Sequence, residues 1–204
     1  AIEVVAFTEE EGLVIGGNGG SKGFSGQPLE ESYIENFQKH NINMEAINSS
    51  KCDKDAILHY LELHIEQGGI LEEKCKSIGI VTGIVGIVRY LVTVKGQANH
   101  GGTTPMRLRD DALMNACRIA IEFNRLVREA GEPMVGTIGW IKTKPGAMNV
   151  VPGEATFIAE LRDLEHERIE IVVNKLMEFT NGMNITYQKI LDDRASMMDE
   201  RIMH

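Results

Sequence analysis

The sequence has few cysteines, no long hydrophobic run and no excess of positive charge, and each shortage argues against a class of protein. Cys52, Cys75 and Cys117 are odd in number and lack CxxC spacing, so we expect a reducing, cytoplasmic setting rather than a disulfide framework. No apolar run approaches the roughly 18 residues that a membrane-spanning helix needs. The net charge of −9, with acidic residues spread along the chain, disfavours nucleic acid or an anionic membrane surface as a partner.

The remaining composition is ordinary for a globular protein, and both ends of the sequence are abrupt. The 204 residues are 43% hydrophobic and 25% charged, which suits one large or two small domains. The chain begins AIEVVAF, without a Met or the charged start of a signal peptide. It ends ASMMDERIMH, without a helix cap. We therefore expect a fragment of a longer chain.

The stretch YLELHIEQGG (60–69) is the most informative part of the sequence. Leu61, Leu63 and Ile65 alternate with polar residues, among them His64. This period of two predicts a strand with one buried face and one face available for chemistry. A half-exposed strand with a solvated histidine would show the same alternation. The pattern alone leaves both interpretations open.

A second polar group follows a predicted strand near the start of the chain. Residues 2–7, IEVVAF, form a continuous apolar run typical of a strand in a parallel sheet. Glu9, Glu10 and Glu11 follow directly, where ligands of open α/β sheets gather. They could form a solvated acidic turn. Alternatively, one binds a metal ion beside a general base, because a divalent cation offsets their mutual repulsion.

The segments between these two stretches have weaker patterns. GGNGGSKGFSG (16–26) fits neither dinucleotide-binding nor phosphate-loop spacing and is predicted to be a mobile loop. Residues 28–39 open with Pro and carry early acidic residues, which predicts a helix. Short helical turns or loops are expected at 53–58 and 69–74.

The second part of the chain predicts a separate small domain. The expected elements are a β-rich stretch (80–97), a loop (99–105), a helix (106–130), a strand (134–142), a loop (144–153), a strand (154–163), a helix (165–180) and a strand (184–191). Their order from about 84 to 192 is β-α-β-β-α-β, the ferredoxin-like motif of two helices on one face of a four-stranded antiparallel sheet. The predicted fold class is thus an α/β segment followed by an inserted α+β domain.

Five motifs occur in order along nearly the whole chain: FTEEEG (7–12), ELHIEQGGILE (62–72), KGQANHGGTTPM (95–106), MNVVPGE (148–154) and ELRD (160–163). They resemble the M20 metallopeptidase-like amidohydrolases, in the branch of N-carbamoyl-L-amino acid hydrolases, allantoate amidohydrolases and β-ureidopropionases. The resemblance implies a partial catalytic α/β domain of zinc-peptidase type over 1–80, a lid and dimerisation domain over 81–194, and re-entry into the catalytic domain over 195–204.

The resemblance also implies a metal centre. Glu11 matches a ligand of one metal ion and His64 a ligand of the other, while Glu10 matches the general base that activates water. Imidazole and carboxylate are common ligands of such ions. Glu9 falls outside the motif and is expected to be solvated.

Four further residues match groups that contact the substrate. Gln67 matches a substrate contact near the metals, and His100 the lid histidine that reaches the partner subunit's site and steadies the oxyanion. Asn149 and Arg162 match residues that hold the substrate carboxylate. From the residues alone, His100 could equally be a loop residue, Asn149 a turn residue and Arg162 part of a surface ion pair.

The sequence departs from the family pattern in two respects. The remaining metal ligands would lie before residue 1 and after residue 204, so the chain alone is expected to be inactive and to bind weakly the two divalent ions, Zn, Mn, Co or Ni, of the whole enzyme. The serine-arginine-aromatic run that commonly follows EEG in the family is replaced by Leu13, Val14 and Ile15.

The expected function is therefore metal-dependent hydrolysis of a carbamoyl or ureido C–N bond in a small molecule. N-carbamoyl-L-amino acids are the first choice, allantoate the second and β-ureidopropionate the third. A homodimer through the lid is expected. The alternative from another class is a lid and dimerisation module without catalysis.

Overall fold

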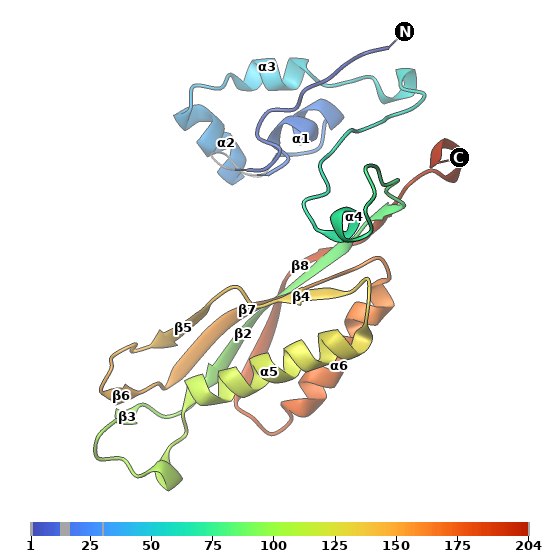
Figure 1. The fold of residues 1–204 in the computed structure, drawn as a ribbon. Coiled ribbons are helices and arrows are strands. Elements are labelled where there is room, and N and C mark those ends of the chain that lie inside the picture. The colour runs from blue at the N-terminus through green and yellow to red at the C-terminus, as the bar shows by residue number, and fades with distance from the viewer. Residues whose placement is uncertain (1, 13–16, 30, 204) are drawn as a thin grey trace. The chain divides into compact units, whose positions relative to one another are not determined.

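The computed structural model describes residues 2–12, 17–29 and 31–203. Its contacts divide the chain into two units, Ala1–Gly68 and Gly69–His204 (Figure 1). Leu13, Val14 and Ile15, which replace the run that commonly follows EEG in the family, lie outside the described residues. No helix in the described ranges is long and apolar enough to cross a membrane.

The first unit is built from short helices and extended segments. The helices are α1 (Gly19–Ser25), α2 (Glu31–Lys39), α3 (Met44–Ser49) and the 3-10 turn η1 (Lys54–Ala56). The Asn43 side chain caps α3 by accepting from the Glu45 amide at 2.8 Å. Phe37 on α2 is the buried hydrophobic side chain among the described residues of this unit. The helix predicted within 28–39 and the turn within 53–58 are confirmed.

The strands predicted at 2–7 and within 60–69 are absent from the described structure. Both segments are extended but pair with no neighbour. Most of their apolar side chains are exposed, with Leu63 fully so at 103%, whereas Phe7 is partly buried against the Phe24 ring. Alternation creates a strand only where a second strand accepts and donates the ladder hydrogen bonds. Within the described chain neither segment finds that neighbour, so these two predictions are wrong here.

The prediction of a mobile loop at 16–26 is also wrong, because Gly19–Ser25 forms α1. The glycines let this helix lie directly against the segment that follows residue 7. A Cβ on Gly20 would lie 2.6 Å from the Thr8 carbonyl oxygen, and the Gly20 amide donates to that oxygen at 2.9 Å. The lack of side chains is thus a packing requirement, not a source of mobility. Gly16 lies outside the described residues.

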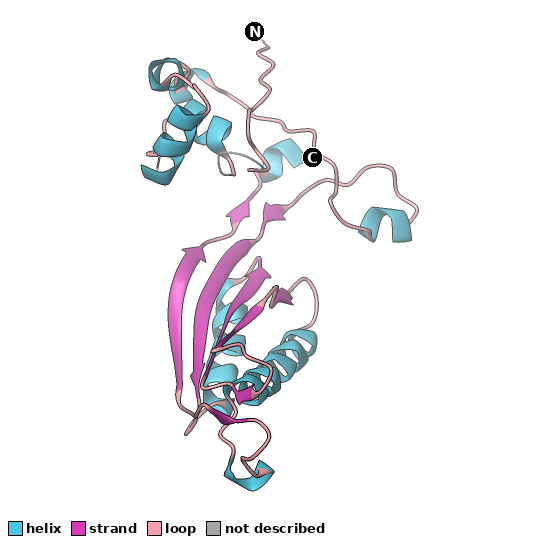
Figure 2. Ribbon diagram, turned by 90° about the vertical axis from the view of Figure 1, so that its left-hand side faces the viewer, coloured by secondary structure: helices cyan, strands magenta, loops and turns pink. Residues whose placement is uncertain are grey.

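The second unit contains the remaining elements: α4 (Ile70–Glu73), β1 (Gly83–Ile84), β2 (Gly86–Lys95), β3 (Asn99–His100), the 3-10 turn η2 (Met106–Leu108), α5 (Ala112–Ala130), β4 (Val135–Thr137), β5 (Ile141–Lys144), β6 (Val150–Val151), β7 (Glu154–Asp163), α6 (His166–Phe179), β8 (Ile185–Asp193), β9 (Ser196–Met197) and α7 (Glu200–Met203). The main sheet has the order β4-β7-β2-β8, with β5 also pairing β7, and every pairing is antiparallel. Helices α5 and α6 both cover one face of this sheet (Figures 1 and 2).

The order of helices and long strands in this unit is the predicted one, with local differences. The long helix begins at Ala112 rather than 106, because Asp111 caps it by accepting from the Leu113 and Met114 amides. The strand predicted at 134–142 is interrupted and forms β4 and β5. The two predicted loops contribute short strands, β3 and β6, which pair with each other.

The hydrophobic core of the second unit lies between the sheet and the two helices. Every second residue of β7 is buried, with Phe157 fully enclosed at 0% exposure. The facing residues on α5 and α6 include Ile119, Phe123 and Ile169. Burial of one such side chain stabilises the fold by about 1.5–3 kcal/mol.

A buried ion pair joins three elements at one end of this core. Asp163, at the end of β7, is 1% exposed, and its Oδ2 lies 3.4 Å from Arg168 Nε on α6. The Arg168 guanidinium also donates to the carbonyl oxygens of Ala130 at 2.8 Å and Gly131 at 2.9 Å. It therefore supplies hydrogen-bond donors to the C-terminal end of α5 and a positive charge beside Asp163 Oδ2, which accepts no hydrogen bond in the described structure.

Candidate active site

Three of the predicted site residues meet in the first unit, although they come from distant parts of the chain. Gln67 Nε2 donates to Glu11 Oε1 at 2.9 Å. His64 Nε2 lies 3.8 Å from the same oxygen, and both side chains are partly exposed. Gln67 adopts a left-handed backbone conformation, with φ of 52°, at the point where the extended segment ends. The two motifs that carry these residues are thus adjacent in space.

Glu10 lies next to this group and is held by a residue that sequence reasoning missed. Ser21 Oγ on α1 donates to the Glu10 carboxylate, at 3.1 Å from Oε1 and 3.0 Å from Oε2. The Asn18 amide donates to the Glu10 carbonyl oxygen at 2.9 Å. No spacing rule links positions 10 and 21, because the contact depends on how α1 packs.

Tyr60 is a second residue that the sequence patterns did not single out. Its hydroxyl donates to Glu62 Oε2 at 2.8 Å. Desolvation, this hydrogen bond and the negative charges of Glu62 and Glu10 raise the pKa of Tyr60 to about 12. The phenol therefore remains protonated at neutral pH, within electrostatic reach of Glu10.

The chemistry of Glu11 and His64 suits a divalent ion, but they make an incomplete ligand set. A carboxylate and an imidazole are standard ligands of zinc and similar ions, and a catalytic site generally uses three protein ligands or more. In the described ranges, no group of three or more His, Cys, Asp or Glu side chains is arranged to hold an ion. The residues present therefore fit part of a metal centre.

His100 and Asn149 meet in the second unit through the short β3–β6 ladder. His100 pairs with Val150, and the Gly101 amide donates to the Asn149 carbonyl oxygen at 2.7 Å. The Gly102 amide donates to His100 Nδ1 at 3.1 Å. Because Nδ1 accepts this bond, the neutral ring carries its proton on Nε2. The exposed His100 therefore offers an N–H donor.

Arg109 supports the loop that carries His100. Its Nε donates to the Thr104 carbonyl oxygen at 3.0 Å, and its Nη2 donates to the Gly101 carbonyl oxygen. One guanidinium thus closes the NHGGTTP segment into a fixed shape. Sequence reasoning did not identify this role, although an arginine close after a glycine-rich loop is a possible signal.

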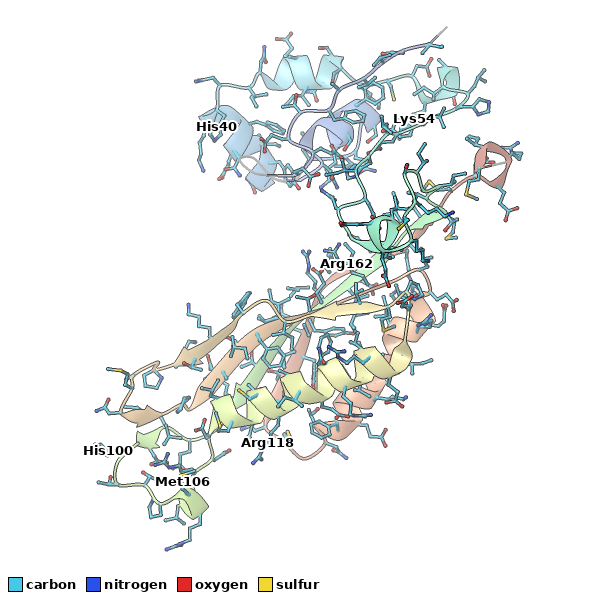
Figure 3. All side chains as sticks on the ribbon, in the orientation of Figure 1. His40, Lys54, His100, Met106, Arg118 and Arg162 are labelled. Atoms are coloured by element: carbon cyan, nitrogen blue, oxygen red, sulfur yellow. The ribbon has the colours of Figure 1, made fainter. Side chains whose placement is uncertain are left out.

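Arg162 lies elsewhere in the second unit. Its Nε donates to Glu160 Oε1 at 2.7 Å, and Glu160 also accepts from Arg89. Burial acts to raise the pKa of Glu160, but the hydrogen bonds from the two arginines outweigh it and lower the pKa. Figure 3 shows Arg162 and His100 at opposite ends of the sheet. The structure therefore does not bring Arg162 together with His100 and Asn149.

Comparison with known proteins identifies the class to which the chain belongs. Residues 82–187 match the M20 peptidase dimerisation domain, and the chain belongs to this family. This confirms the resemblance drawn from the five motifs.

Similar proteins named as amidohydrolases or amidases are about twice as long as this chain. The chain is 35% identical to an N-carbamoyl-L-amino-acid amidohydrolase of Pseudomonas sp. (strain NS671), over 92% of this chain and 50% of that protein. It is 36% identical to the allantoate amidohydrolase of Escherichia coli (strain K12), over 94% of this chain and 47% of that protein. A hydantoinase/carbamoylase-family amidase from Burkholderia phymatum superposes with a TM-score of 0.80 and 28% identity, covering 98% of this chain and 54% of that structure.

Proposed function

We propose that the protein containing this chain is a metal-dependent amidohydrolase that cleaves a carbamoyl or ureido C–N bond. The observation that carries the proposal is the meeting of Glu11, His64 and Gln67, with Glu10 beside them. Relatives named for N-carbamoyl-L-amino acids and for allantoate support this substrate class. N-carbamoyl-L-amino acids are the first substrate to test, allantoate the second and β-ureidopropionate the third.

Glu11 and His64 would hold ions of a two-metal centre, with Zn, Mn, Co or Ni as candidates. Such ions supply Lewis acidity, which acidifies water and polarises the substrate carbonyl. The centre needs further ligands, because these two side chains alone fall short of a catalytic set. We therefore expect the chain by itself to bind metal weakly.

Glu10 performs the proton transfers of the proposed reaction. It takes a proton from the attacking water as the water oxygen bonds to the carbamoyl carbon. It then returns that proton to the leaving nitrogen as the C–N bond breaks. Glu10 is suited to this role because it directly precedes the proposed ligand Glu11 in the chain and its carboxylate is held by Ser21.

The residues of the second unit would bind and stabilise the substrate. The Nε2–H of His100 would donate to the carbonyl oxygen as negative charge develops there. The Asn149 amide and the Arg162 guanidinium each suit a substrate carboxylate. Because one chain holds them at opposite ends of the sheet, they would bind the same substrate only if a partner subunit supplies one of them. The fixed tautomer of His100 supports its role as a donor.

We further propose a ferredoxin-like lid over residues 81–194 that forms a homodimer, with partial catalytic segments at 1–80 and 195–204. The sheet order, the two helices on one face and the match to a dimerisation domain support this. His100 and Arg162 lie near opposite ends of β7, about 30 Å apart at 3.3 Å per residue. Such a separation suits residues that serve two different sites, one of which a partner subunit would complete.

The test is an assay of the whole protein with N-carbamoyl-L-methionine, allantoate and β-ureidopropionate in the presence of Zn²⁺ or Mn²⁺. We expect one of them to be hydrolysed and Glu10→Gln to lower kcat by at least about 100-fold. His64→Ala should abolish turnover, whereas His40→Ala, at an exposed position of the same unit, should not. A protein that is dimeric but inert with all three substrates and both metals would instead support a non-catalytic lid and dimerisation module.

A further inference from the structure

The Glu10 carboxylate has a contact that the proposed reaction does not itself require. Ser21 Oγ lies at nearly equal distances, 3.0 and 3.1 Å, from the two carboxylate oxygens. We infer that Ser21 is a positioning residue that sets the orientation of the Glu10 carboxylate. The inference rests on the proposed function, in which Glu10 is the general base.

A hydroxyl in this place can orient the carboxylate without blocking it. The last torsion of a glutamate side chain is broad and has no strong intrinsic preference. Ser21 has one proton to donate, which the two carboxylate oxygens at 3.0 and 3.1 Å share with the more distant Asn18 carbonyl oxygen at 3.3 Å, while a carboxylate has about four acceptor positions. The remaining lone pairs of Glu10 stay available for the proton of water.

The backbone around Ser21 makes the contact rigid. The Asn18 amide donates to the Glu10 carbonyl oxygen and the Gly20 amide to the Thr8 carbonyl oxygen, both at 2.9 Å. A side chain on Gly20 would collide with Thr8. The helix that carries Ser21 is therefore fixed to the segment that carries Glu10, which is the arrangement a positioning contact needs.

The same helix provides a matched control. Ser25 lies one turn further along α1, and within the described part of the chain its Oγ donates to the Lys22 carbonyl oxygen of that helix, at 3.2 Å. Ser21→Ala and Ser25→Ala remove the same atom from the same helix. Only the first removes the contact with Glu10.

The experiment compares the steady-state kinetics of Ser21→Ala, Ser21→Thr and Ser25→Ala in the whole protein. We expect Ser21→Ala to lower kcat roughly 10- to 100-fold, because small misplacement of a catalytic group has effects of that size, and to change KM less than about twofold. Ser21→Thr, which keeps the hydroxyl, should recover most of the rate, and Ser25→Ala should match the wild type. In a Glu10→Gln background, Ser21→Ala should have no further effect, whereas a general structural defect would add to it. A wild-type kcat in Ser21→Ala would overturn the inference.

A second measurement separates this inference from the proposed function. Three-bond NMR couplings report whether χ1 and χ2 of Glu10, the torsions that place its carboxylate beside Ser21, occupy one rotamer or several. We expect one rotamer in the wild type and in Ser25→Ala, and averaging in Ser21→Ala. If the wild-type protein hydrolyses no substrate, the proposed function fails, and averaging confined to Ser21→Ala still upholds the positioning contact. Unchanged couplings in Ser21→Ala would overturn it.

Discussion

The two units contain the same apolar alternation, but only the second converts it into a sheet. In β7 the alternate residues Ala155, Phe157 and Ala159 are buried, and the strand pairs with a neighbour on each side. In the first unit Leu61 and Leu63 alternate equally well, yet both are highly exposed. The difference teaches that alternation predicts which face a strand would bury, whereas the strand itself depends on a partner.

The two units also differ in what stabilises them. The second has one contiguous cluster of buried side chains between the sheet and its helices. The described part of the first has Phe37 as its buried hydrophobic side chain, together with an edge-on contact between Phe7 and Phe24, caps, turns and close glycine contacts. We therefore expect the second unit to unfold cooperatively and the first to open locally at lower free energy.

The largest expected effect tests this difference with one substitution in each unit. Phe157→Ala should lower the free energy of unfolding by about 3–5 kcal/mol, because it empties the centre of a packed core. Phe37→Ala should leave that transition nearly unchanged and increase amide exchange only in the helices of the first unit. Urea denaturation and hydrogen exchange measure the two effects. An equal shift of the main transition by both variants would show that the units do not differ in this way.

A smaller effect is expected from the buried ion pair of the second unit. Arg168→Ala should cost about 3 kcal/mol, because it leaves Asp163 as an unpaired buried carboxylate and the end of α5 without donors. Arg125→Ala is the control. Its guanidinium pairs with Glu122 and Glu129 on an exposed helix surface, so the cost should stay below about 1 kcal/mol.

Removing the buried charge as well should recover part of the loss. In Asp163→Asn/Arg168→Ala no unpaired carboxylate remains, so the double variant should be more stable than Arg168→Ala. Urea denaturation of the three variants checks this. If Arg125→Ala and Arg168→Ala cost the same, burial is not what makes the Arg168 pair strong.

The smallest expected effect is a dependence of stability on pH. Hydrogen bonds from Lys144 and Lys95 lower the pKa of Glu154 from 4.5 to about 2. Because the folded state holds the proton less tightly than the unfolded state, this contact stabilises the second unit above pH 4.5 and is lost as the pH falls toward 2. The thermal midpoint should therefore drop more between pH 6 and pH 3 in the wild type than in Glu154→Gln. The extra drop should begin at roughly the pH at which an ordinary glutamate carboxyl titrates. Equal drops would contradict the assigned pairing.

The sequence predicted the second unit well because several local signals agreed there. The helical stripe of α5 ends at Gly131, and the buried residues of β7 follow a strict period of two. The start of α5 was misplaced, because the capping role of Asp111 was not recognised among the polar residues before it. The adjacency of His100 and Asn149 was not predicted, since a two-residue ladder leaves no pattern in the sequence.

The first unit was harder to predict because its structure depends on contacts between distant segments. Glu11, His64 and Gln67 were selected through motifs, and the structure brings them together. Their roles remain predictions. Ser21 and Tyr60 were missed because their contacts arise from tertiary packing, and the glycines of α1 had been interpreted as a source of mobility rather than of close approach.

The ten residues of β7 have a consequence for the spacing between the two ends of the main sheet. At about 3.3 Å per residue, the length of this strand sets the distance between the His100 end and the Arg162 end of the sheet. Deleting two residues would keep every side chain on its face of the sheet and shorten the strand by about 7 Å. Deleting one would exchange the two faces and bring Arg162 to the core side. The number of residues in the strand thus determines both the distance between its ends and the face of the sheet on which Arg162 lies.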